Sequence, residues 1–369
     1  MRIGVIAAIV MALLAQAIPL AASRPVTAAV PANIVVVMAD DMDARMVEDL
    51  PRLQALLSEE GLSFSSFYVA APQCCPSRAS FLRAQYPHNT GVLANGPPQG
   101  GFSAFRNNGN EASTIATWLD DAGYRTGLVG KYLNDYEKAP KHVPQGWDRW
   151  FVYAGKGKYR NYLISDEGKV RAYGKKNGKK KTKKKHYQTD VFTRKAVDFI
   201  NKTPQGTPLF LYLSPSAPHE PATPADRHKR APVARNQAPR LPSFNEEDVS
   251  DKPGIWSNQG QLSGKRIKDI DGLYARQLRS MFAVEDMVED VMNALEAQNR
   301  LDNTYILFVS DNGFHHGEHR IAKGKNTPFE ESTRSPLIVV GPGVPAGATT
   351  DAMASMVDLG PTFADLAGV

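Results

Sequence analysis

The chain has 369 residues, of which 42% are hydrophobic and 22% are charged. This composition is typical of a globular protein, and it excludes a disordered chain, a collagen-like fibre and a small disulfide scaffold. The net charge of +6 is local, since eight lysines lie between Lys175 and Lys185. The remainder of the chain is slightly acidic, so the charge does not predict a nucleic acid partner.

The N-terminus has the pattern of an export signal. Arg2 precedes an apolar stretch, and small residues would allow cleavage after Ala22 or Ala29. Polar or helix-breaking residues interrupt the stretch, and no later segment has the roughly 20 apolar residues of a membrane-spanning helix. We therefore expect residues 1–29 to be a signal peptide of a secreted protein without stable membrane insertion. The alternative is an uncleaved membrane anchor.

Strands alternate with helices after the signal. Residues 33–38 are a β-branched run typical of a strand buried on both faces. Helical stretches follow at 50–60 and 113–122, each closed by a glycine. The later elements are predicted to be strands at 126–129, 208–213, 304–309 and 337–340, a long amphipathic helix over 274–298 and a helix over 353–366 interrupted near Pro361. This alternation predicts an α/β fold with a largely parallel sheet.

Two stretches are predicted to run over the surface rather than in the core. Residues 151–190 contain a hairpin that turns at 166–168 and then the lysine-rich segment, 175–185. Residues 221–268 are rich in Pro, Arg, Asn and Ser. The lysines could attract a polyanion at low salt. We prefer a solvated loop, because no aromatic residue lies within the lysine run.

Polar residues follow four of the predicted strands. The strand ends are followed by Asp40 and Asp41, by Lys131, by His219, and by Asp311 and Asn312. In parallel sheets, ligands gather beyond the carboxyl ends of the strands. A single acidic pair is more simply a turn or a helix cap. Two such pairs favour a Ca²⁺ site, with Mg²⁺ as the alternative, since hard oxygens suit these ions and a bound cation offsets the repulsion among three carboxylates.

The two cysteines are adjacent, which disfavours a relaxed disulfide between them. They precede Pro76, a good residue for the first turn of a helix whose N-terminus would favour an anion. The segment Cys74-Cys75-Pro76-Ser77-Arg78 resembles the motif of the type I sulfatases, the formylglycine-dependent members of the alkaline phosphatase superfamily. The resemblance implies that Cys74 is oxidised to Cα-formylglycine by a formylglycine-generating enzyme, and that Cys75 fills a variable place.

The resemblance covers nearly the whole chain after the signal. It is carried by segments 39–41, 129–134, 217–221 and 310–315 and by Lys325, and it is strongest to N-acetylglucosamine-6-sulfatases and heparan-type extracellular endosulfatases. It implies an alkaline-phosphatase-like three-layer α/β/α sandwich with a central, mostly parallel mixed sheet. Residues 32–369 would be the N-terminal catalytic domain. The C-terminal subdomain that follows it in the family is expected to be missing from this chain.

The resemblance also implies roles for the polar residues. Arg78 would stabilise the formylglycine diol, and Lys131 and Lys325 would clamp the sulfate oxygens. His219 would contact sulfate and donate a proton to the leaving alcohol. The implied metal ligands are Asp40, Asp41, the modified Cys74, Asp311 and Asn312.

One position departs from the family pattern. Many members have a histidine two residues after the lysine, where it acts as the base that releases sulfate, and this chain has Leu133. Asn134 and His315 are the nearest polar substitutes, and we predict that they contact the substrate. His316 and His319 are either substrate contacts or loop histidines that face water.

The favoured interpretation is a secreted, metal-dependent sulfatase that hydrolyses sulfate monoesters, such as glucosamine 6-sulfate in a sulfated carbohydrate. A phosphoester or phosphonate monoester hydrolase of the same superfamily is the first alternative. The second is a non-catalytic protein that binds sulfated glycans, if Cys74 is never oxidised. Hydrolysis of nitrophenyl sulfate and nitrophenyl phosphate separates the two enzymes.

Overall fold

The computed structural model describes residues 31–174 and 184–369. The predicted signal peptide and residues 175–183 of the lysine-rich segment lie outside this described part. Residues 31–369 form one compact unit. No helix in the described ranges is both long and apolar enough to cross a membrane.

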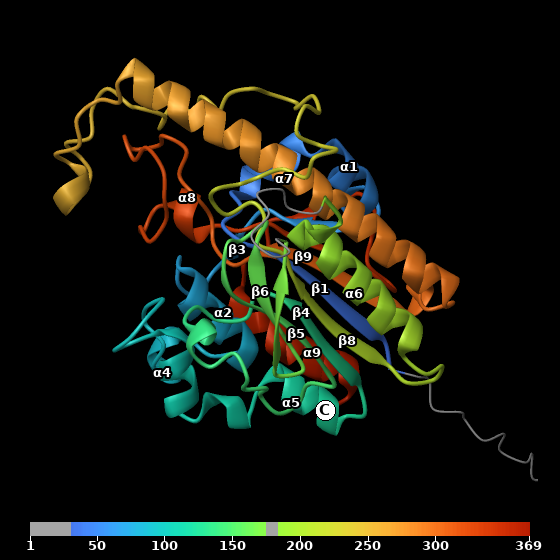
Figure 1. Cartoon of the computed structure of the whole chain (residues 1–369). Coiled ribbons are helices and arrows are strands. Elements are labelled where there is room, and N and C mark those ends of the chain that lie inside the picture. The colour runs from blue at the N-terminus through green and yellow to red at the C-terminus, as the bar shows by residue number, and fades with distance from the viewer. Residues whose placement is uncertain (1–30, 175–183) are drawn as a thin grey trace, which may run out of the picture. The chain divides into compact units, whose positions relative to one another are not determined.

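A ten-stranded mixed sheet organises the molecule (Figure 1). The strand order is β11-β2-β10-β9-β1-β8-β4-β5-β6-β7. The five strands from β9 to β5 are parallel, and antiparallel strands flank them on both sides. The strands of this sheet are β1 (Asn33–Ala39), β2 (Leu62–Phe64), β4 (Arg125–Gly130), β5 (Arg149–Lys156), β6 (Tyr162–Asp166), β7 (Lys169–Tyr173), β8 (Leu209–Ser214), β9 (Thr304–Ser310), β10 (Leu337–Val340) and β11 (Ala348–Thr350). A separate pair is formed by β3 (Phe67–Tyr68) and β12 (Ala354–Ser355).

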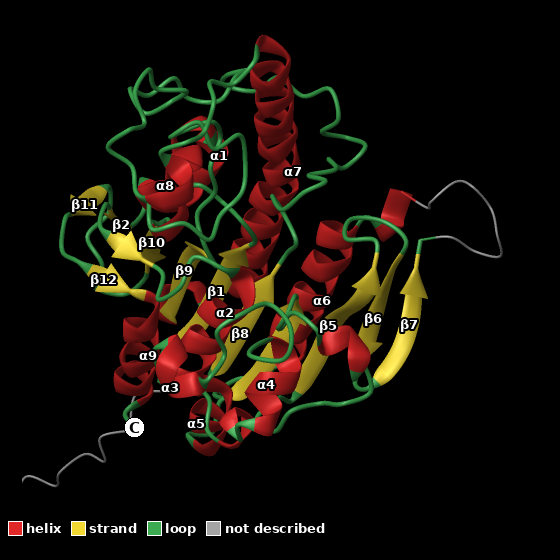
Figure 2. Ribbon diagram, turned by 90° about the vertical axis from the view of Figure 1, so that its left-hand side faces the viewer, coloured by secondary structure: helices red, strands yellow, loops and turns green. Residues whose placement is uncertain are grey.

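Helices cover both faces of the sheet (Figures 1 and 2). The α-helices are α1 (Pro51–Leu53), α2 (Cys74–Arg83), α3 (Pro87–Thr90), α4 (Gly101–Asn107), α5 (Ile115–Asp121), α6 (Gln188–Lys202), α7 (Gly264–Ala297), α8 (Glu330–Thr333) and α9 (Leu359–Ala367). A hydrophobic core lies on each face of the sheet. The central strand β1 contributes to both cores, because its successive side chains point to opposite faces. Val35 and Val37 pack with α6 and α7, whereas Ile34 and Val36 pack with α2, α5 and α9. The predicted three-layer α/β architecture is thus confirmed.

Two helices differ from the sequence pattern. Helix α7 starts at Gly264, ten residues before the predicted start, because Ser263 caps it by accepting a hydrogen bond from the Arg266 amide at 3.3 Å. The first turns of α7 are polar, so apolar periodicity in the sequence does not indicate where the helix starts. Pro361 does not interrupt α9, since it lies in the first turn, where a helix loses no hydrogen bond to proline.

The expectation that residues 151–190 leave the core was wrong for most of that range. Strand β5 pairs in parallel with β4, and Phe151 is fully buried. The predicted hairpin is present as β6 and β7, turning at Glu167-Gly168. The surface loop at 221–263 has a single short helical turn, Gly254–Trp256.

Candidate active site

Four parallel strands bring polar residues to one edge of the sheet. Strands β1, β4, β8 and β9 all run in the same direction and end at this edge. The chain stays paired for one residue beyond the strand ends. The Lys131 amide donates to the Ser214 carbonyl at 2.7 Å, and the Asp311 amide donates to the Ala39 carbonyl at 3.1 Å. Lys131 and Asp311 are therefore held in place by backbone hydrogen bonds that continue the sheet.

A local backbone feature allows two consecutive acids to serve one site. In a strand, neighbouring side chains point to opposite faces. Asp41 instead adopts a φ of 67°, a left-handed conformation that aspartate tolerates better than most residues. Its amide donates to Asp311 Oδ1 at 3.0 Å, which closes the turn against the end of β9. Asp40 and Asp41 thereby both contact Cys74.

Cys74 is the first residue of helix α2 and lies against the acids. Its Sγ atom is 3.6 Å from Asp40 Oδ1 and 3.6 Å from Asp41 Oδ1. Lys325 Nζ lies 2.8 Å from the same sulfur and also pairs with Asp41. Both cysteines are free thiols, as their adjacency predicted. The helix begins at the cysteines themselves rather than after them, and Pro76 is its third residue.

Arg78 is fully buried and ties the site to the sheet. Its guanidinium donates to Asp311 Oδ2 at 2.7 Å, to Ser214 Oγ at 2.6 Å and to the Tyr212 hydroxyl at 3.2 Å. It also donates to the Lys131 carbonyl at 3.1 Å. With so many partners, Arg78 fixes the position of Asp311 and has little freedom to move toward a ligand.

Lys131 and His219 complete the cluster. Lys131 Nζ donates to Asp40 Oδ1 at 2.8 Å and lies 3.8 Å from Asp311 Oδ2. His219 Nε2 is 3.5 Å from Asp41 Oδ2. His219 lies in the loop that follows β8, where its amide donates to the Ser216 carbonyl at 3.0 Å.

The charges in the cluster oppose one another. Burial alone would favour a neutral Asp40, but Lys131, His219 and Arg78 hold the pKa of its carboxyl well below the usual range. Burial raises the pKa of the Cys74 thiol to about 12, which leaves it protonated at neutral pH. A protonated, buried thiol is a poor nucleophile. As an unmodified cysteine, this residue is therefore poorly suited to catalysis.

The donor set fits a divalent cation. Ligand atoms of Asp40, Asp41, Cys74 and His219 all lie within 4.8 Å of one another. Asp40 Oδ2 and Asn312 Oδ1 are buried oxygens without a hydrogen-bond partner, the kind of atom that a cation would satisfy. Asn312 Nδ2 donates to Asp41 Oδ1 at 2.9 Å and so places that amide in the cluster.

A cavity of about 280 Å³ lies beside the cluster. Asp40 and Lys131 line it, as does Asn134, one of the two residues predicted to contact the substrate. Lys158, which the sequence did not single out, lines it as well. Lys158 Nζ is 2.7 Å from the nearest ring nitrogen of His219, and burial lowers its pKa. No motif marks Lys158, because its place depends on the connection between β5 and β6.

His315 does not lie where a substrate could reach it. Its side chain is fully buried, Nε2 bonds to Thr327 Oγ1 at 2.7 Å, and burial lowers its pKa to about 3. The prediction that His315 contacts the substrate is at odds with this placement, since the side chain is a neutral internal brace. The motif alone could not show in which direction the ring points.

His316 and His319 also have internal roles. His316 is buried against Gln277 of α7, with Nε2 2.6 Å from the amide oxygen. His319 Nδ1 lies 2.8 Å from Glu246 Oε1, and its ring stacks on Phe329 with centroids 4.2 Å apart. Neither of the two interpretations left open by the sequence describes them, because His316 joins its loop to α7 and His319 joins the same loop to Glu246.

Comparison with known proteins gives consistent findings. The family model described as Sulfatase matches residues 32–369. An N-acetylglucosamine-6-sulfatase of Capra hircus is 35% identical over 344 residues, which cover 91% of this chain and 60% of that protein. A putative extracellular sulfatase Sulf-1 homolog of Caenorhabditis elegans is 33% identical over 343 residues, 91% of this chain and 47% of that protein. The chain thus spans about half to three fifths of the length of these relatives.

A solved structure shares the fold. It is described as a complex with its substrate D-glucosamine-2-N,6-O-disulfate, and it matches with a TM-score of 0.69 at 23% identity. The match covers 92% of this chain and 77% of that chain. At this identity the likeness extends to the architecture alone.

Proposed function

The chain belongs to the sulfatase family, and from this premise we propose that it hydrolyses sulfate monoesters of a sulfated sugar such as glucosamine 6-sulfate. The names of the two relatives support the sulfatase activity, and the name of the first supports the sugar. The proposal covers residues 32–369 as the catalytic domain.

The observation that carries the proposal is the position of Cys74. Its sulfur lies 2.8 Å from Lys325 Nζ and 3.6 Å from a carboxylate oxygen of each of Asp40 and Asp41. A reacting group at this atom would face both acids and cations. Such a site can bind a negatively charged ester while acids hold a cation next to it.

The nucleophile would be a modified Cys74. Oxidised to Cα-formylglycine and hydrated, this residue supplies two hydroxyls, one to attack sulfur and one to release the sulfate afterwards. The thiol itself could not complete the cycle, because it would be left sulfated. Its raised pKa is a second disadvantage.

The surrounding cations would stabilise the sulfate oxygens and supply a proton. Lys131 and Lys325 both lie within ion-pair distance of the acids and keep raised pKa values despite burial. Asp40 favours the charged form of Lys131, and Cys74 and then Asp41 favour that of Lys325. They therefore stay cationic when a sulfate ester arrives. His219 would donate a proton to the departing alcohol oxygen, and Lys158, whose Nζ lies 2.7 Å from the ring, would help to hold the ring in place.

A divalent cation would be held by Asp40, Asp41, Asp311, Asn312 and the modified Cys74. When bound, Ca²⁺ or Mg²⁺ would polarise the nucleophilic hydroxyl and neutralise charge on the sulfate. Arg78 would keep Asp311 oriented toward that position. Asn134 would contact the substrate from the cavity wall.

The protein would act outside the cytoplasm after removal of residues 1–29. A relative named as an extracellular sulfatase supports this placement. Maturation would require a formylglycine-generating enzyme in the producing cell. N-terminal sequencing of the exported protein tests the cleavage. The expected N-terminus is the residue that follows Ala22 or Ala29, and a protein that still begins with Met1 would contradict cleavage.

The activity is tested with small esters. Calcium-loaded protein, produced together with a formylglycine-generating enzyme, should hydrolyse nitrophenyl sulfate much faster than nitrophenyl phosphate. The Cys74→Ala variant should lose at least about a thousandfold of the rate, since it lacks the nucleophile. The Cys75→Ala variant, which keeps Cys74, is the matched control. Preferential hydrolysis of the phosphate would replace the proposal by a phosphoester hydrolase, and binding of sulfated sugars without turnover would replace it by a glycan-binding protein.

A further inference from the structure

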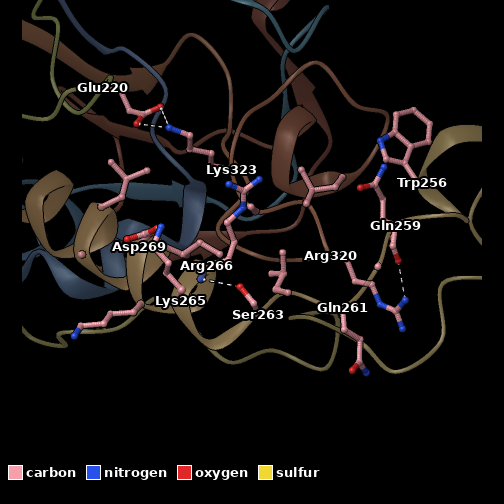
Figure 3. Close-up of a pocket in the computed structure, with 18 of the residues that line it drawn as sticks. Glu220, Trp256, Gln259, Gln261, Ser263, Lys265, Arg266, Asp269, Arg320 and Lys323 are labelled. Carbon is pink, nitrogen blue, oxygen red and sulfur yellow. Dashed lines mark hydrogen bonds and ion pairs between the residues drawn. The ribbon is translucent and has the colours of Figure 1, made fainter.

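A second, larger hollow lies beside the site. This groove, of about 1120 Å³, is bounded by the first turns of α7, by the loop before α7 and by residues 320–323 (Figure 3). Glu220 and Lys323 form one wall, where Lys323 Nζ donates to Glu220 Oε1 at 2.7 Å. Glu220 follows His219 directly, and Lys323 precedes Lys325 by two residues. Glu220 and Lys323 are therefore no more than about 8 Å along the backbone from His219 and Lys325, two residues of the proposed active site.

The groove is strongly basic. Six cationic side chains line it against two acids. Helix α7 supplies four of the cations from its exposed first turns. Lys265, Asp269, Gly272 and Arg276 follow one another at helical spacing on one face, which makes this face a wall of the groove.

Half of these cations already have partners. Lys265 pairs with Asp269 at 3.8 Å, and Lys323 pairs with Glu220. Arg320 is held by backbone, since its Nε donates to the Glu246 carbonyl at 2.9 Å and its guanidinium also donates to the Gln259 carbonyl at 2.8 Å. Lys265 and Lys323 are thus paired with acids of the groove, whereas Arg320 keeps its charge but is fixed in position by the two carbonyls.

The other three cations have no acidic partner. Arg266, Lys268 and Arg276 are exposed, and within residues 31–174 and 184–369 no carboxylate lies at ion-pair distance from them. They span ten residues of helix, or about 15 Å. An anionic ligand with charges at intervals along its length would satisfy them together. A single small anion would not.

The remaining lining favours a carbohydrate. Trp256 is half-buried in the wall, with its ring centroid 5.3 Å from that of Phe329 in an edge contact. Gln259 and Gln261 add amide groups that can donate to or accept from sugar hydroxyls (Figure 3). An indole beside amides offers an apolar surface for a sugar ring together with hydrogen bonds. Nucleic acid grooves usually carry several stacking aromatics, whereas this groove has one.

We propose that this groove binds the anionic sugars adjoining the sulfate ester under attack, so that the substrate is a sulfated oligosaccharide or polysaccharide rather than a free monosaccharide. The inference rests on the proposed function, because it requires the sulfate ester to lie at the proposed active site while the adjoining sugars lie in the groove. Arg266, Lys268 and Arg276 would pair with successive sulfate or carboxylate groups, and Trp256 would contact a sugar face. Binding in the groove would add to the affinity for longer chains without taking part in bond cleavage.

The test compares two triple variants of the matured, calcium-loaded protein. The groove variant is R266Q/K268Q/R276Q. The control is K169Q/K229Q/R230Q, which removes the same charge from exposed positions that do not line the groove. The substrates are a heparin hexasaccharide and glucosamine 6-sulfate. Steady-state kinetics are measured at low and at physiological salt.

The groove substitutions should raise KM for the hexasaccharide by a factor about ten times larger than the factor for the monosaccharide. The control substitutions should change neither KM. The salt dependence of hexasaccharide KM should weaken in the groove variant alone. Equal losses in both variants, or no preference of the native protein for the longer substrate, would overturn the inference.

Direct binding separates this inference from the proposed function. Calorimetry with C74A and the heparin hexasaccharide needs no turnover, and the groove substitutions should weaken binding by about tenfold in that background. If the groove substitutions weaken hexasaccharide binding while the native protein shows no sulfatase activity, the groove assignment is upheld and the proposed activity is refuted. A DNA duplex of equal charge that competes as well as the hexasaccharide would show a general polyanion surface and overturn the assignment to glycans.

Discussion

Cys74 is surrounded by residues from widely separated parts of the sequence, and each of its neighbours restricts what it can do. The acids contact its sulfur, Lys325 donates to it, and burial raises its pKa to about 12. The motif around Cys74 made this residue and Arg78 predictable from sequence, and the position of Lys131 after a predicted strand marked that residue. The direction of a side chain was less predictable, as the buried ring of His315 shows.

Lys158 provides a test at the scale of one residue. It lies 2.7 Å from His219 and lines the cavity beside the acid cluster. Lys158→Met should lower kcat for nitrophenyl sulfate by about tenfold to a hundredfold and change KM little, because the ring of His219 loses one of the groups that hold it. Lys158→Arg should restore most of the rate, since it keeps a cationic donor.

The control for Lys158 is Lys169→Met, at an exposed position on β7. It should leave both kinetic constants unchanged. A fall in stability that accounts for the lost activity of Lys158→Met, with no rescue by arginine, would show that Lys158 merely supports the fold.

At the scale of elements, the close approach of β4 and β8 positions Lys131. Gly130 ends β4 with a φ of +138°, and a Cβ atom there would lie 2.1 Å from the Ser214 carbonyl oxygen. Gly130→Ala should therefore separate the two strand ends and displace Lys131. We expect a loss of at least about tenfold in activity and of about 2–4 kcal/mol in the free energy of unfolding.

Gly206→Ala is the matched control, because Gly206 also has a positive φ, +82°, but nothing lies within 4 Å of the added atom. It should cost about 1 kcal/mol and leave activity intact. Urea denaturation and nitrophenyl sulfate kinetics measure both quantities. Similar results for the two glycines would show that strand proximity does not position Lys131.

Helix α7 contains a buried acid that should make stability depend on pH. Burial raises the pKa of Glu285 from 4.5 to about 7, although the Leu53 amide donates to its carboxylate at 3.0 Å. The folded state thus retains a proton that the unfolded state releases. This contribution to stability is complete below about pH 4.5 and is lost as the pH rises through 7.

Glu285→Gln should remove that loss, because the amide stays neutral and its oxygen can still accept from Leu53. At pH 8 the variant should be more stable than the native protein by about 1–3 kcal/mol, and near pH 4.5 the two should differ little. Urea denaturation at both pH values measures this. Glu296→Gln, at an exposed position on the same helix, is the control. The account would be contradicted if the native protein became more stable relative to Glu285→Gln as the pH rises from 5 to 8.

The elements themselves differed in how well the sequence predicted them. Buried strands such as β1 and β9 were clear, because an apolar β-branched run has few other uses. The first turns of α7 were missed because they face the groove and are polar. Residues 151–173 were misplaced because β6 and β7 do form a hairpin and β7, at the edge of the sheet, is mostly exposed, so the pattern resembles a surface hairpin.

At the scale of the whole molecule, the sheet joins polar side chains that are 271 residues apart in the sequence. Asn312 donates to Asp41 across the ends of β9 and β1. The parallel topology predicted this meeting, since strand ends share one edge. Three buried carboxylates in one place repel one another, and a bound cation should therefore stabilise the fold as a whole.

Calcium addition to chelator-treated protein should raise Tm by several degrees, since a ligand at a hundred times its Kd adds about 2.7 kcal/mol to stability. Asp311→Asn should remove most of this shift. Asp302→Asn, at an exposed position before β9, should retain it. An equal response of all three proteins in differential scanning calorimetry would show that the acid cluster does not hold the ion.

The most direct measurement is the mass of the peptide covering residues 73–83, determined by tandem mass spectrometry on protein produced with a formylglycine-generating enzyme. The account predicts an aldehyde, lighter than cysteine, at Cys74 and an intact thiol at Cys75. An unmodified Cys74 in protein that still hydrolyses sulfate esters would contradict it, and so would an aldehyde found at Cys75 instead.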